Sequence, residues 1–121
     1  MTSTLNTDIS FSPDEIRTEA AIVLRTVEQI TFDLDYFSRT IRQGDYNTTV
    51  IADIERHLGQ ARRNCADATA IAEHVLMMRA EFEEMSQPEL KNEAEQLRDA
   101  FALLALADSA YLRAFEVASN R

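Results

Sequence analysis

Three stretches of the chain carry apolar residues at alternating steps of three and four, and this repeat constrains the fold more than any other feature. In the first stretch the repeat is formed by Ile16, Ala20, Val23, Val27, Ile30, Leu34, Phe37 and Ile41. A seam of this period places one apolar stripe along a helix, and it is typical of helices packed side by side along their whole length. Only two glycines and two prolines occur in 121 residues, so little interrupts such helices.

The second and third seams keep the spacing but include charged residues. The second comprises Ile51, Ile54, Leu58, Ala61, Cys65, Ala68, Ala72, Val75, Arg79 and Phe82, and the third comprises Leu90, Ala94, Leu97, Phe101, Leu104, Asp108, Tyr111, Phe115 and Ala118. A charge on a seam needs a partner. We therefore expect Asp108 to pair with Arg62, and Arg79 to pair with Glu93 or Glu95.

Small residues occupy the middle of the second seam, between residues 61 and 72. Small side chains let helix axes approach closely, so this region is expected to pack most tightly. Gly59 lies beside the seam, and close approach of a neighbouring helix would explain a glycine inside a helix, where it costs about 1 kcal/mol relative to alanine.

Capping signals mark the ends of the three helices. Ser12 followed by Pro13 and Glu15 predicts one helix start, and Ser86 followed by Pro88 and Glu89 predicts another. Gly44 is suited to end the first helix, and a cap at residue 47 or 48 starts the second. The expected helices are therefore about 13–43, 48–85 and 87–118, within one domain of residues 13–121 that follows an N-terminal tail of residues 1–12.

Three such helices joined by short turns predict an all-α, antiparallel, up-down-up three-helix bundle with coiled-coil-like heptad seams. The apolar surface exceeds one seam per helix, since a second set of apolar residues lies outside the seams: Leu103, Leu106, Ala110, Met77 and Met78. Because a helix that is apolar all round is normally buried all round, we expect this set to form a protein interface. Dimerisation could then complete a larger bundle, while a wider core is the alternative.

The formal net charge of −9 argues against direct nucleic-acid binding and against anionic membrane surfaces. Up-down-up folding gathers carboxylates at one end of the bundle, in an acidic pole formed by Glu81, Glu83, Glu84, Glu89, Glu93 and Glu95. This pole could simply be a solvated surface. It could also mimic nucleic-acid phosphates and block a nucleic-acid-binding protein.

The sequence offers no recognisable catalytic, cofactor or metal site. Cys65 lies on a seam, and His57 and His74 lie on different faces of one helix, so no nucleophile meets a base within it. An Mg²⁺-dependent helical nucleotide hydrolase would use Glu-x-x-Glu on one helix and Glu-x-x-Asp on the next. The pair Glu81 and Glu84 fits the first half, but the second half fails because the candidate acids are spaced by four.

These features together predict a non-catalytic, acidic helical protein that binds another protein as an adaptor, assembly factor or inhibitor and self-associates. The acidic nucleic-acid mimic and the Mg²⁺-dependent hydrolase are the alternatives. A single cysteine is typical of a reducing compartment. Residues 1–12 lack a signal-peptide pattern, and no apolar run approaches about 18 residues. The expected location is the cytoplasm.

Overall fold

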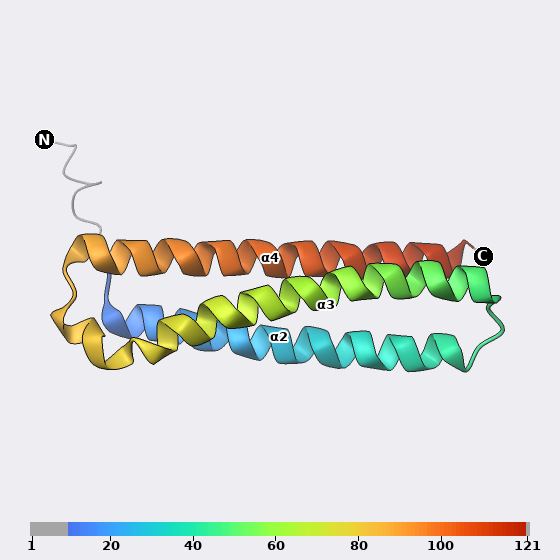
Figure 1. Ribbon diagram of the computed structural model, residues 1–121, viewed down its shortest axis with the longest axis horizontal. Coiled ribbons are helices and arrows are strands. Elements are labelled where there is room, and N and C mark those ends of the chain that lie inside the picture. Colours follow the sequence, from blue (N-terminus) through green and yellow to red (C-terminus); the bar gives the residue numbers. More distant parts are fainter. Residues whose placement is uncertain (1–9, 121) are drawn as a thin grey trace, which may run out of the picture.

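A computed structural model describes residues 10–120, apart from the side chains of Arg79 and Ala80. It contains three long helices, α2 (Pro13–Arg42), α3 (Thr48–Met77) and α4 (Gln87–Ser119), and a short 3₁₀ helix, η1 (Arg79–Glu84). The long helices lie side by side and alternate in direction (Figure 1), and the described residues include no strand. The predicted all-α, up-down-up three-helix bundle is confirmed.

Side-chain caps begin all three long helices, as predicted. The Oγ atom of Ser12 accepts from the amide of Glu15 at the start of α2, and Oδ1 of Asn47 accepts from the amide of Val50 at the start of α3. At the start of α4, Ser86 and Glu89 form a complete capping box. These hydrogen bonds satisfy amides that have no partner within their own helix.

The second helix ends earlier than predicted, at Met77 and not near residue 85. The chain then tightens into η1, which carries Phe82 into the core with 1% of its surface exposed. The guanidinium carbon of Arg17 lies 5.5 Å from the centre of this ring, a cation–π contact. The seam position of Phe82 was therefore predicted correctly, although its helix was not.

The buried stripe of α4 differs from its predicted seam. Leu90, Leu97, Leu104 and Ala118 are buried as expected, but the alternate positions are filled by Glu93, Ala100, Ala107 and Ala114. The predicted members one residue further on, Phe101, Asp108 and Phe115, are exposed. The stripe is thus turned toward α3, with which α4 makes the most extensive contact of any helix pair.

Alanine explains this rotation. Ala61, Cys65, Ala68 and Ala72 of α3 are buried, and the alanines of α4 give that surface an equally small neighbour. Small residues on both helices permit close approach of the two backbones. Gly59 does not serve this approach, because a methyl group added there would meet only the guanidinium of Arg63, at 4.0 Å.

The predicted pairing of Asp108 with Arg62 is wrong. Arg62 donates from Nη1 to Oδ1 of Asp35 on α2 over 2.6 Å, and Asp108 is exposed. The predicted pairing of Arg79 lies outside the described side chains. None of the described helices is long and apolar enough to cross a membrane.

Candidate protein-binding face

The structure does not gather the predicted apolar interface into one surface. Ala110 is fully buried in the core of the bundle, so its assignment to an outer face is wrong. Leu103 and Met78 are partly buried against the core. Only Leu106, 54% exposed, and Met77, 83% exposed, are open to solvent.

Leu106 and Met77 lie far apart and in different surroundings. Leu106 lines a shallow groove between α3 and α4, and its other lining residues are polar: Arg56, His57, Gln60, Asn64 and Arg113. Met77 ends α3, about 20 Å along that helix from Asn64 at 1.5 Å per residue. These two side chains therefore do not form one apolar contact surface.

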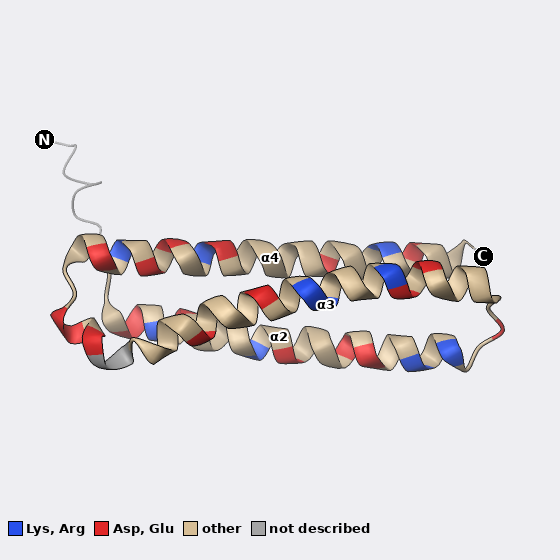
Figure 2. Ribbon diagram, in the orientation of Figure 1, with Lys and Arg blue, Asp and Glu red and all other residues tan. Residues whose placement is uncertain are grey.

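The predicted acidic pole is present at the turn between α3 and α4, where Figure 2 shows carboxylate-bearing residues gathered. Glu81, Glu83, Glu84, Glu89 and Glu95 are exposed, but Glu93 is buried. Hydrogen bonds from Ser86 lower the pKa of the Glu89 carboxyl, as expected for a carboxylate that caps a helix. Most of the pole is surface, and Glu93 belongs to the interior.

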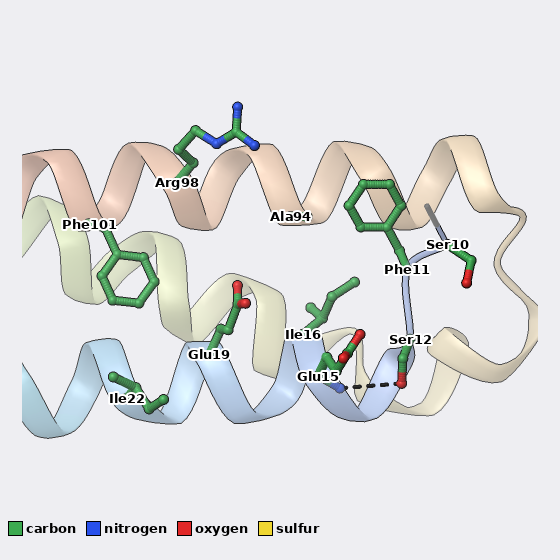
Figure 3. A pocket seen from close by; sticks show the side chains of 10 residues that line it. All are labelled: Ser10, Phe11, Ser12, Glu15, Ile16, Glu19, Ile22, Ala94, Arg98 and Phe101. Atoms are coloured by element: carbon green, nitrogen blue, oxygen red, sulfur yellow. Dashed lines mark hydrogen bonds between the residues drawn. The ribbon is translucent and has the colours of Figure 1, made fainter. Parts of the chain in front are cut away.

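A larger apolar face lies between α2 and α4, the pair of long helices with the least mutual contact. At its N-terminal half a groove of about 630 Å³ is lined by Ser10, Phe11, Ser12, Glu15, Ile16, Glu19, Ile22, Ala94, Arg98 and Phe101. Phe101 extends from α4 toward Ile22 of α2 (Figure 3). Both are substantially exposed, at 37% and 40%.

Phe11 closes one end of this groove and is tied to α4. Its amide donates to Oε1 of Gln87 over 2.7 Å, and its carbonyl accepts from Nε2 of the same side chain over 3.0 Å. Ser10, Phe11 and Ser12 are the described part of the predicted N-terminal tail; residues 1–9 lie outside the described residues.

An aromatic cluster continues the face along the other half of the bundle. The rings of Phe37 and Phe115 stack with centres 4.8 Å apart, and Tyr111 meets both edge-on. Phe115 remains exposed, as do Tyr36 on α2 and Leu112 on α4. Aromatic rings so arranged attract one another beyond the area they bury, so the cluster joins α2 to α4 beneath an apolar surface.

Helical spacing aligns these exposed side chains into two rows. Ile22 and Tyr36 are fourteen residues apart on α2, and Phe101 and Phe115 are fourteen apart on α4. Residues two heptads apart lie on one side of a packed helix. We call the surface formed by Ile22, Tyr36, Phe101, Leu112 and Phe115 the α2/α4 face.

Carboxylates border the α2/α4 face. Glu15 and Glu19 line its groove, and neither forms an ion pair with another described side chain. Arg98 points away from α2 (Figure 3). Further along the face, burial is the main cause of a raised pKa of the Tyr111 hydroxyl, and the carboxylates of Asp33 and Asp108 add smaller increases. The border is therefore largely negative.

The described side chains that could act in catalysis or bind a metal do not come together in one site. Cys65 is buried, and burial raises the pKa of its thiol although Arg62 offsets part of the effect. Nε2 of His57 lies 3.9 Å from Oδ1 of Asp53, one turn away on the same helix. Among residues 10–120, no three His, Cys, Asp or Glu side chains are placed to hold a metal ion together.

Comparison with known proteins gives no relative for this chain. No family model matches it, and no curated protein and no solved structure matches it at a significant level.

Proposed function

We propose that this chain is a non-catalytic protein-binding bundle, and that its α2/α4 face receives an amphipathic helix of a partner protein. The observation that carries the proposal is the set of large apolar side chains that stay exposed along two neighbouring helices. Ile22, Tyr36, Phe101, Leu112 and Phe115 are all between 37% and 61% exposed. Large apolar side chains that gather on one side of a soluble protein are typical of a surface that binds another molecule.

The shape of the face favours a helix as its ligand. α2 and α4 run in the same direction and leave a furrow between them, and the exposed residues border that furrow at heptad spacing. An added amphipathic helix would insert its apolar positions into the furrow and complete a four-helix arrangement.

The charge of the face favours a partner with basic residues beside its apolar stripe. Glu15, Glu19, Asp33 and Asp108 lie along the furrow, with a net charge of −9 over the whole chain. A two-fold dimer would use the same surface on both subunits, so these carboxylates would lie on both sides of the interface. A basic partner helix would meet complementary charge.

Paired substitutions test this proposal. A binding partner captured from the native host is first purified, and its affinity for single variants is then measured by calorimetry. Phe101→Ser and Phe115→Ser should each weaken binding at least tenfold, because both remove central exposed apolar area. Leu106→Ser and Met77→Ser are matched controls on other surfaces and should bind normally.

Three results would contradict the proposal. One is normal binding by the Phe101 and Phe115 variants. Another is loss of binding on reversing Glu83 and Glu84 to lysine while the α2/α4 face is intact, which would assign binding to the acidic pole. The third is a wild-type dimer, seen by sedimentation, that dissociates on Phe101→Ser; this would assign the face to a second copy.

We also propose that the protein is cytoplasmic. Cys65 is the sole cysteine and a free thiol, which is compatible with a reducing compartment.

A further inference from the structure

Glu93 has a buried carboxylate group with an oxygen atom that accepts no hydrogen bond from the described part of the chain. Only 5% of the residue is exposed, and its Oε1 atom is buried without a hydrogen-bond partner among the described residues. A buried carboxylate oxygen with no donor loses its hydration and gains nothing in return, which is costly in a folded protein. Such a group calls for a ligand or partner of positive charge.

A pocket of about 450 Å³ includes Glu93 in its lining and lies between the two residues that flank η1 and the first turns of α4. Its lining consists of Met78, Met85, Pro88, Glu89, Asn92 and Glu93. Three of these side chains are apolar, and the two methionines are flexible enough to adapt to a guest. The lining therefore combines three apolar side chains with the buried carboxylate of Glu93.

We propose that this pocket binds the side chain of an arginine from a partner protein, with its guanidinium against Glu93 and its alkyl stem along Met78 and Met85. A guanidinium can donate two parallel hydrogen bonds to one carboxylate. It is also more weakly hydrated than the ammonium group of lysine, so it loses less on burial. Its stem has three methylene groups, which cover apolar surface well.

A metal ion fits this pocket less well than an arginine. The described residues include no group of three His, Cys, Asp or Glu side chains able to hold a metal. Around the pocket, the exposed Glu81, Glu84 and Glu89 add negative charge, which would attract a basic segment. This site is separate from the α2/α4 face, and the inference does not depend on the function proposed for that face.

Arg79 is the chain's own candidate partner for Glu93. It begins η1, and its side chain lies outside the described residues. The test must therefore distinguish an arginine supplied by the same chain from one supplied by a partner.

Methyl NMR of the four methionines tests the proposal directly. The probe is N-acetyl-arginine N-methylamide, titrated into protein labelled at the methionine methyl groups. The signals of Met78 and Met85 should shift saturably, with a dissociation constant of about 1–10 mM. Met77 is 83% exposed and outside the pocket lining, so its signal should stay in place. The citrulline analogue, which has the same shape without the charge, should not bind.

Two substitutions complete the test. Glu93→Gln keeps the shape and should weaken binding of the arginine probe at least tenfold, while Glu95→Gln, an exposed carboxylate two residues on, should leave it unchanged. If Glu93→Gln does not fold, the contrast between arginine and citrulline probes on the wild-type protein decides.

The proposal is overturned by any of three outcomes. One is no saturable shift of Met78 or Met85 at about 100 mM probe, some ten times the weakest expected dissociation constant. Another is binding of the citrulline or lysine analogue as strong as that of arginine. The third is binding seen only in Arg79→Gln, which would show that the chain's own arginine occupies the pocket.

Discussion

The hydroxyl of Ser38 on α2 donates a 2.8 Å hydrogen bond to Oε2 of Glu55 on α3. Ser38 is buried, and Nη2 of Arg42 lies 3.2 Å from the same carboxylate oxygen. This small network is specific in direction and position, whereas the apolar contacts around it are not. It therefore helps to set the register between the end of α2 and the start of α3.

Ser38→Ala should lower the free energy of unfolding by about 1 kcal/mol, since it removes the donor to a partly buried carboxylate. Arg42→Ala should cost less, under about 0.5 kcal/mol, because its side chain is mostly exposed. Urea denaturation measures both. A double-mutant cycle between Ser38→Ala and Glu55→Ala should give a favourable coupling, and an absence of coupling would show that the contact contributes nothing.

The bundle could be predicted from sequence because α2 and α3 each have one unambiguous seam. In α4, however, alanines flank the large residues, so two stripes were possible: one through Ala94, Phe101 and Phe115, and one through Ala100 and Ala107. Hydrophobicity favoured the first, because phenylalanine is more apolar than alanine. The structure has the second, since the small seam of α3 selects small neighbours.

The same error concealed the candidate site. Phe101 and Phe115 were assigned to the core, so they could not be counted as exposed surface, while Ala110 was counted as surface and is buried. The sequence also gives no sign that Glu93 is buried. It is one of several acidic residues near the start of a helix, where acidic side chains commonly interact with the helix dipole. Both features depend on how α4 is rotated about its axis.

Close packing of α3 against α4 can be tested by adding volume at one alanine. Ala107→Leu should lower the free energy of unfolding by about 1–3 kcal/mol, because the residue is fully buried and the extra atoms have no space. Ala105→Leu is the matched control on the same helix, at an exposed position, and should change stability by under about 0.5 kcal/mol. Equal effects of the two substitutions would contradict the observed rotation of α4.

A substitution at Gly59 is expected to stabilise the protein, in contrast to Ala107→Leu. It lies within α3 without a positive φ angle, and a methyl group there would touch only Arg63 at ordinary contact distance. Gly59→Ala should therefore raise the free energy of unfolding by about 0.5–1 kcal/mol, because alanine loses less backbone entropy in a helix. Thermal unfolding followed by circular dichroism measures this. A destabilised variant would indicate that a neighbouring group needs the space.

The raised pKa of Tyr111 predicts a loss of stability in alkali. Its ordinary value is 10.0, and burial together with Asp33 and Asp108 raises it in the folded protein. Above about pH 10 the unfolded chain therefore releases the phenolic proton more readily than the folded chain does. This contribution to stability is complete below the unfolded pKa and is lost as the pH rises toward the folded one.

Urea denaturation between pH 9 and 11 should show the decline, and Tyr111→Phe should make it shallower. Asp108→Asn removes one of the two carboxylates without removing the ring, so its decline should be intermediate. A decline identical in all three proteins would exclude Tyr111 as its source.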